Sequence, residues 1–308
     1  AEPEAFWWEV FDDLGLAGSL GEPRPGGREW REPPHPPGAV DWFPDAQVNH
    51  AECLLAKGRP DDVALYEADE DGGPSAMTYG ELRRRVARLQ WRLKIQCGVG
   101  EGDAVAGVVR NDAAAVVAML ATTSLGASWS SFAPDLGAEA ATARLRAVAP
   151  KVVFASPEAT WRGTRVTDVL AKVEALSTAV PSVSAVLACS NFEFPPSNDS
   201  SSLPLRFSRG PFSRPVYVMF SSGTTGPPKC LAQGFGATLI HAKEGAYQMD
   251  VKPRDAVFWY TSTSWMMWPW LVGVALANNG RALLYDGDPF RRDLFALAHD
   301  TDVAVFGA

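Results

Sequence analysis

The sequence has few of the residues that build disulfide frameworks or zinc sites. Its four cysteines, Cys53, Cys97, Cys189 and Cys230, are scattered without a C-x-x-C pair, and its four histidines do not cluster. This spacing argues against a disulfide scaffold and a zinc site, and it favours a reducing cytosol.

Long apolar runs and basic charge are also scarce. No run of the sequence approaches the roughly 20 apolar residues that a membrane-spanning helix needs. The net charge of -8 disfavours nucleic acid and anionic membranes as partners. The first residues, Ala1 to Glu4, include neither Met nor a basic flank, so we predict no signal peptide and expect the true N-terminus to lie upstream. The predicted location is the cytoplasm.

Apolar and aromatic residues are plentiful. Of the 308 residues, 46% are apolar and 21% are charged, which is typical of a soluble globular protein with a large core. The eleven tryptophans exceed what such a chain usually carries. They indicate aromatic packing and an aromatic-lined pocket.

Short apolar runs alternate with helical patterns from Val63 onward, which predicts an α/β fold of parallel β-sheets flanked by helices. Thr78 and Glu81 have the spacing of a capping box, and Asp112 precedes an Ala-rich helix. A helix is expected over 6–14, an extended segment over 21–37 and a polar loop over 191–202. Strands are expected at 63–66, 103–109, 127–132, 152–155, 184–188, 216–220, 256–260, 281–285 and 303–306.

The most distinctive segment is a hydroxyl-rich loop that follows the apolar run 216–220. Four hydroxyls can donate to anionic oxygens, two glycines let the backbone approach a ligand, and a lysine adds positive charge. Backbone N–H groups in such a nest favour anions. The loop does not fit G-x-x-x-x-G-K-[ST], so we predict a different polyphosphate site, one that wraps departing pyrophosphate. It comprises Ser221, Ser222, Gly223, Thr224, Thr225, Gly226, Pro227, Pro228 and Lys229.

A solvated Ser/Thr/Gly turn is the alternative interpretation, but nine residues in this order after a strand rarely arise by chance. The loop resembles the signature [ST]-[ST]-G-[ST]-T-G-x-P-K of the superfamily that contains acyl- and aryl-CoA ligases, firefly luciferase and nonribosomal adenylation domains. All fixed positions match. Further segments, spread over nearly the whole chain, resemble acetoacetyl-CoA synthetases. They are 3–7, 42–46, 119–131, 134–137, 264–268 and 284–289.

The segment Trp265, Met266, Met267 and Trp268 is placed near the acyl pocket by this resemblance. Two tryptophans and two methionines make an adaptable apolar wall. A cluster in the protein core is the alternative, because aromatic residues are usually buried.

Three positions depart from the pattern of the synthetases. Gln233 stands where His is usual, Arg110 where Pro is usual, and Ser264 where Gly is usual. None of these departures touches the phosphate loop.

The resemblance implies an ATP-dependent acid–CoA ligase that forms acetoacetyl-CoA from acetoacetate through an acyl-adenylate, with ATP, Mg²⁺ and CoA. Residues 1–60 would be an N-terminal docking segment, and 61–308 part of an AMP-binding domain. The main catalytic lysine is expected beyond Ala308, so no catalytic residue or metal ligand is assigned. The chain alone is expected to be inactive and loosely folded or poorly soluble.

Two alternatives stay open at this point. The full protein could activate another short acid, such as acetate or propionate. The chain could also be a non-catalytic, truncated nucleotide-binding fragment.

Overall fold

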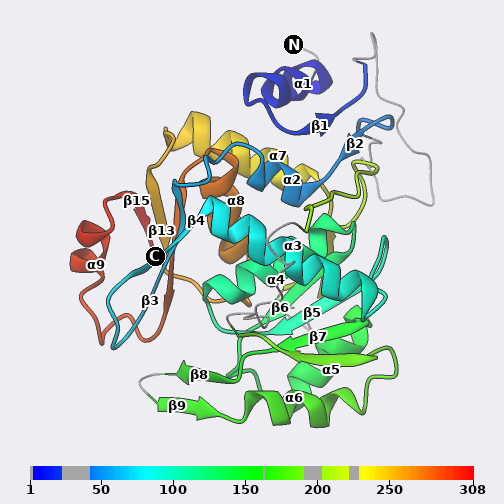
Figure 1. Cartoon of the computed structure of the whole chain (residues 1–308), viewed down its shortest axis with the longest axis vertical. Helices are drawn as coiled ribbons and strands as arrows, with labels where there is room; N and C mark the ends of the chain where they lie inside the picture. Colours follow the sequence, from blue (N-terminus) through cyan, green and yellow to red (C-terminus); the bar gives the residue numbers. More distant parts are fainter. Residues whose placement is uncertain (1–2, 23–41, 162–163, 191–202, 222–228) are drawn as a thin grey trace.

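The computed structural model describes residues 3–22, 42–161, 164–190, 203–221 and 229–308 (Figure 1). Two β-sheets form the framework, as the alternating sequence pattern predicted. The first is a six-stranded sheet in the order β10 (Ala185–Ala188), β7 (Val152–Ala155), β5 (Ala104–Val108), β6 (Ser128–Phe132), β11 (Tyr217–Ser221) and β12 (Lys229–Gln233). The second is a five-stranded sheet in the order β15 (Val303–Gly307), β13 (Ala256–Trp259), β14 (Arg281–Asp286), β3 (Val63–Asp69) and β4 (Ser75–Thr78).

Both sheets are parallel except at one edge. Strand β12 pairs antiparallel with β11, and β4 pairs antiparallel with β3. The sequence pattern did not predict either edge strand, nor the hairpin of β8 (Glu158–Trp161) and β9 (Thr164–Thr167). The parallel strands matter for function because ligands bind beyond the carboxyl ends of such strands.

Helices form a middle layer between the sheets and cover their outer faces (Figure 1). The middle layer contains α2 (His50–Leu55), α3 (Tyr79–Ile95), α4 (Ala113–Ser124) and α8 (Met267–Ala277), and α7 (Gly236–Lys243) packs against α8. On the outer face of the six-stranded sheet lie α5 (Ala138–Val148) and α6 (Val169–Ser177), while α9 (Leu294–Asp300) covers the five-stranded sheet at β15. A π-helical turn, Glu244–Gln248, follows α7.

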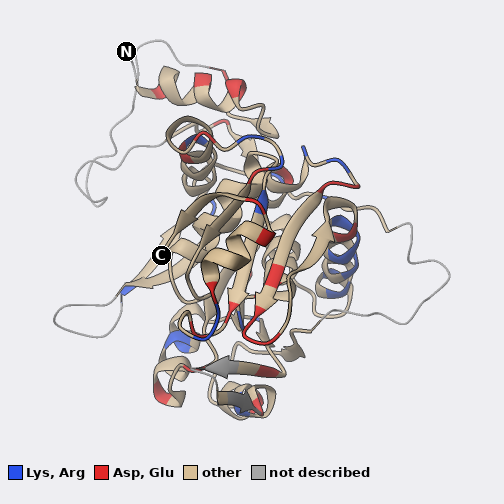
Figure 2. Cartoon of the chain, turned by 90° about the vertical axis from the view of Figure 1, so that its left-hand side faces the viewer, with Lys and Arg blue, Asp and Glu red and all other residues tan. Residues whose placement is uncertain are grey.

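Three hydrophobic clusters match this layering. The largest fills the middle layer, a second lies between the six-stranded sheet and α5 and α6, and a third lies under α9. Every residue of α4 is buried, which explains why this helix is apolar on all sides. Figure 2 shows that most strand residues are uncharged and that one group of basic residues lies on the Arg-rich α3.

Helix starts follow the predicted caps. The Thr78 hydroxyl accepts a hydrogen bond from the Glu81 N–H at 3.2 Å, and the Asp112 carboxylate accepts one from the Ala115 N–H at 2.9 Å. The reciprocal half of the capping box is not formed, because the Glu81 carboxylate pairs with Arg85 instead.

The N-terminal part contains α1 (Pro3–Asp13) and the short pair β1 (Gly18–Ser19) and β2 (Gln47–Val48). The predicted helix 6–14 is therefore present. Most of the predicted extended segment 21–37 and all of the loop 191–202 lie outside the described residues. Helix α2 packs against α4 and α8, so residues before 60 already contribute to the main core.

Candidate functional site

The predicted phosphate loop connects two paired strands. Ser221 ends β11, Lys229 begins β12, and the two residues lie opposite each other in the antiparallel ladder. The intervening residues 222–228, which include Ser222, Gly223, Thr224, Thr225 and Gly226, lie outside the described residues. The loop therefore begins at the carboxyl end of a parallel strand, with Lys229 exposed at its other end.

A pocket lies along β11, where β6 and β11 diverge, and it reaches Phe220, the residue before Ser221. Their described strands share one ladder pair, Tyr217 opposite Trp129, whereas β5 and β6 pair along their full length. Beyond that pair, the Ser130 hydroxyl donates to the Val218 carbonyl at 2.7 Å. The hollow between the strands is open to solvent and encloses about 40 Å³.

Five of the twelve residues that line the pocket are aromatic, and a few polar groups lie among them. Ser131 donates to the Thr263 carbonyl at 2.7 Å, which ties β6 to the loop after β13. The full lining is Trp129, Ser131, Phe132, Arg144, Tyr217, Val218, Met219, Phe220, Thr263, Ser264, Trp268 and Pro269.

The Trp-Met-Met-Trp segment is divided by the start of α8. Trp268 is fully buried and lines the pocket. Trp265 and Met266 are 67% and 59% exposed and do not line it, while Met267 packs against the main core. Of the four residues, Trp268 alone lines the pocket, and the acyl-pocket role stays a prediction for all four.

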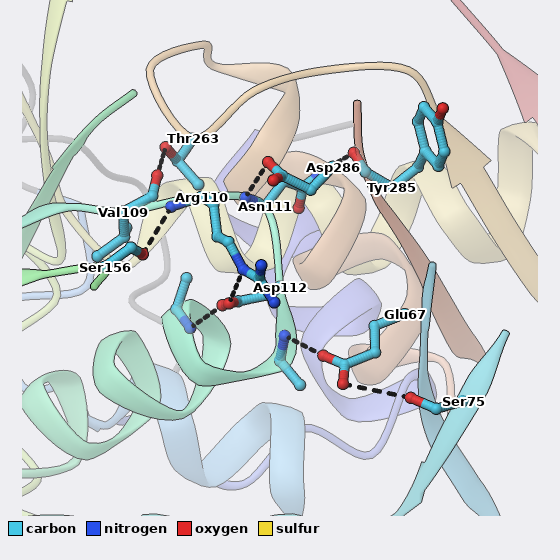
Figure 3. Close-up of polar contacts among 12 residues, drawn as sticks. Glu67, Ser75, Val109, Arg110, Asn111, Asp112, Ser156, Thr263, Tyr285 and Asp286 are labelled. Carbon is cyan, nitrogen blue, oxygen red and sulfur yellow. Dashed lines mark hydrogen bonds and ion pairs between the residues drawn. The ribbon is translucent and has the colours of Figure 1, made fainter. Parts of the chain in front are cut away.

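Asn111 connects the two sheets (Figure 3). Its side-chain oxygen accepts from the Trp268 indole N–H at 2.9 Å. Its side-chain nitrogen donates to the carbonyls of Tyr285 at 3.1 Å and Thr261 at 3.3 Å. Its backbone N–H donates to the Asp286 carboxylate at 3.1 Å. No role for Asn111 was predicted from the sequence, although an Asn between a buried strand and an N-cap Asp is a usable signal.

Three carboxylates gather around this connection with one guanidinium (Figure 3). Glu67 accepts from the Ala113 N–H at 3.0 Å, and Arg110 donates to Asp112 at 2.7 Å. Burial raises the pKa of Asp286 to about 6, against the opposing effects of the Asn111 N–H and Arg110. Burial likewise raises the pKa of Asp112, with Arg110 opposing it. Within the described ranges, no group of three His, Cys, Asp or Glu side chains could hold a metal ion.

Two of the departures from the synthetase pattern make contacts that the usual residue could not make. The Arg110 N–H donates to the Ser156 hydroxyl at 3.1 Å, and proline has no N–H. The Ser264 hydroxyl accepts from the Ala133 N–H at 2.6 Å, and glycine has no side chain. Gln233 ends β12 and is half-buried, and a polar role for it stays untested.

The comparison with known proteins places this geometry in a family. The model of the family described as "AMP-binding enzyme" matches residues 55–308. The chain belongs to this family. Membership agrees with the predicted fold and with the signature loop, and it accounts for a hydroxyl-rich turn at the end of β11.

Among AMP-binding enzymes, the chain is similar to several CoA ligases. It is 36% identical to an acetoacetyl-coenzyme A synthetase of Rhizobium meliloti (strain 1021), covering 100% of this chain and 48% of that protein. It is 36% identical to a malonamoyl-CoA synthetase of Penicillium aethiopicum, and the match covers 92% of this chain and 42% of that protein. The structure of an acetoacetyl-CoA synthetase from Streptomyces lividans superposes with a TM-score of 0.85 at 34% identity. The match covers 99% of this chain and 48% of that one. The predicted resemblance is confirmed, and the chain spans about half the length of these relatives.

Among the residues that the structure describes, no helix is both long and apolar enough to cross a bilayer.

Proposed function

We propose that this chain is part of an ATP-dependent acid–CoA ligase that activates a short acid with a carbonyl group β to its carboxylate. One observation supports this most directly. A pocket with five aromatic residues in its lining lies between β6 and β11 and reaches Phe220, which directly precedes the first residue of the hydroxyl-rich loop. An acid held in that pocket and a polyphosphate held by that loop would be neighbours.

The acid class is drawn from the names of the relatives. The acetoacetyl and malonamoyl groups both carry a carbonyl on the carbon next but one to the thioester carbon. The pocket in this chain offers aromatic walls with the hydroxyls of Ser131 and Thr263 nearby, which suits a small, flat and weakly polar acyl group.

The proposed reaction has two steps. A carboxylate oxygen attacks the α-phosphorus of ATP, the bond to the β-phosphate oxygen breaks, and pyrophosphate leaves. The CoA thiol then attacks the acyl carbon, loses its proton, and AMP leaves. Lys229 and the loop hydroxyls would stabilise the charge that develops on pyrophosphate.

The described residues contain no three-ligand metal cage. Mg²⁺ usually binds through substrate phosphates and one or two carboxylates. When bound, the ion would neutralise phosphate charge. The lysine that drives adenylation is not assigned within 1–308. The docking role of 1–60 and the cytoplasmic location also belong to this proposal.

An acid panel with the full-length protein that contains this chain would test the function. We expect acid-dependent exchange between ATP and labelled pyrophosphate, with a higher kcat/KM for acetoacetate or malonamate than for acetate or propionate. Preference for acetate or propionate would support the second acid class instead. ATP binding without any acid-dependent exchange would support a non-catalytic nucleotide-binding protein.

A further inference from the structure

The hydroxyl groups of Ser131, Thr263 and Ser264, which all line the pocket, differ in how their hydrogens are used. Ser131 donates to the Thr263 carbonyl at 2.7 Å, and Thr263 donates to the Val109 carbonyl at 2.6 Å. The Ser264 hydroxyl instead accepts the Ala133 N–H at 2.6 Å. A hydroxyl that accepts from an N–H keeps its own hydrogen for another partner. Among the described residues, no acceptor takes that hydrogen.

The loop between β13 and α8 holds Ser264 in place from both sides. On one side, Thr263 is bonded through its hydroxyl and its carbonyl to residues of the six-stranded sheet and its end. On the other side, the Trp265 N–H donates to the Ser262 carbonyl at 3.0 Å. A hydrogen-bond donor that is held in this way loses little conformational freedom when a ligand binds.

Other donors in the pocket lining also have no acceptor among the described residues. They are the indole N–H of Trp129, which is 1% exposed, and the Nε–H of Arg144. A buried donor without an acceptor is costly until a ligand or a water molecule supplies one. A carbonyl oxygen only accepts hydrogen bonds, so it is the ligand group that matches this lining.

The size of the hollow limits which part of a ligand enters it. Its volume of about 40 Å³ has room for about three water molecules. That space suits a terminal acetyl or carboxamide group better than a long acyl chain. The acetoacetyl and malonamoyl groups in the names of the relatives end in such a carbonyl group.

We propose that Ser264 is a specificity-determining residue, whose hydroxyl donates its hydrogen to the carbonyl oxygen β to the carboxylate of the acid. The N–H that Ser264 accepts strengthens it as a donor, because hydrogen bonds in a chain polarise one another. The glycine that is usual at this position in the synthetases has no hydroxyl. The reacting carboxylate of the acid is the competing acceptor. This inference rests on the proposed function for the identity of the acid.

A comparison of acetoacetate with butyrate would test this role, because the two acids share a carboxylate and a carbon chain but only acetoacetate has the β-oxygen. The assay is exchange between ATP and labelled pyrophosphate with the full-length protein. We expect Ser264→Ala to lower the ratio of kcat/KM for acetoacetate to that for butyrate by about 3- to 10-fold, the effect of one neutral hydrogen bond. In the matched control Ser131→Ala, the ratio should change less than about twofold, because the Ser131 hydrogen is already used within the protein.

Thermal melting without ligand first shows which variants fold, and Ser264→Gly replaces Ser264→Ala if the alanine variant does not. An unchanged ratio in the folded variant would overturn the proposal. An equal fall for both acids would also overturn it, because that result indicates a contact with the carboxylate or a purely structural role.

Calorimetric titration of each acid into the same protein separates this inference from the ligase function. Exchange that prefers acetoacetate but does not respond to Ser264→Ala would leave the ligase function standing and refute the role of Ser264. A loss of acetoacetate binding in Ser264→Ala, with butyrate binding unchanged and no exchange in the wild type, would support the role of Ser264 and refute the ligase function. A wild-type protein that binds neither acid would refute both.

Discussion

Replacing Asp286 by Asn should stabilise the protein at neutral pH and change little at pH 4. Asp286 ends β14 and accepts the Asn111 backbone N–H at 3.1 Å. An Asn side-chain oxygen can accept the same bond without carrying charge. The substitution therefore isolates the free-energy cost of ionising a carboxyl in this partly buried position.

The magnitude follows from the pKa of Asp286, which burial raises from its usual 3.8 to about 6. Since each pKa unit corresponds to about 1.4 kcal/mol, the ionised form costs the native state about 3 kcal/mol. The native state binds the proton more tightly than the unfolded state. Stability therefore falls as pH rises from about 4 to about 6, and the full cost is present above that window.

Urea unfolding of wild type and Asp286→Asn between pH 4 and pH 8 would measure this effect. The stability gain of the variant should be near zero at pH 4 and about 2–3 kcal/mol at pH 7.5. Asp250→Asn is the matched control, because the Asp250 side chain is 80% exposed. A gain that does not depend on pH, or a loss of stability at pH 7.5, would refute the reasoning.

Three further predictions concern the same region. Asn111→Ala should lower the free energy of unfolding by about 3–5 kcal/mol, because it removes three side-chain hydrogen bonds and leaves the buried Trp268 N–H without an acceptor. A loss below about 1 kcal/mol in urea unfolding would contradict the role of Asn111 as a connection between the sheets. Trp268→Ala should lower the free energy of unfolding by about 3–5 kcal/mol and should shift the relative kcat/KM values for short acids. Trp265→Ala, at an exposed site, should change the free energy of unfolding by less than about 1 kcal/mol. An equal loss of thermal stability in the two variants would contradict the difference in burial between the two tryptophans. Lys229→Ala in the full-length protein should reduce kcat/KM for ATP in pyrophosphate exchange by about 30- to 1000-fold, or about 2–4 kcal/mol, while Lys252→Ala, at an exposed turn, should leave it unchanged.

The parallel core of this fold could be predicted from the sequence because each inner strand is a short apolar run followed by a helical pattern. The edge strand β12 could not, because its residues are mostly exposed and its first residue, Lys229, looks like the end of a loop. Its pairing depends on the partner strand β11 rather than on a local pattern. Strand β4 was not predicted for the same reason, since its first two residues are exposed.

The candidate site was predictable only in part. The phosphate loop could be identified from the sequence because all of its functional groups come from consecutive residues. The pocket depends on the divergence of β6 from β11, two strands joined by a single ladder pair. The role of Asn111 depends on neighbours from distant elements. Which tryptophan faces the pocket is decided by the turn that starts α8, and residue type alone does not reveal it.

The placement of β3 inside the five-stranded sheet has a consequence for biosynthesis. Strand β3 lies between β14 and β4, and the contact of Tyr66 with Arg281 joins residues 215 positions apart. At typical translation rates of about 5–20 residues per second, β3 emerges from the ribosome roughly 10–40 s before its parallel partner exists. The local hairpin with β4 can form during that interval, but the other edge of β3 stays open. A nascent chain stalled before β14 would therefore present an unpaired strand edge to chaperones or to other nascent chains.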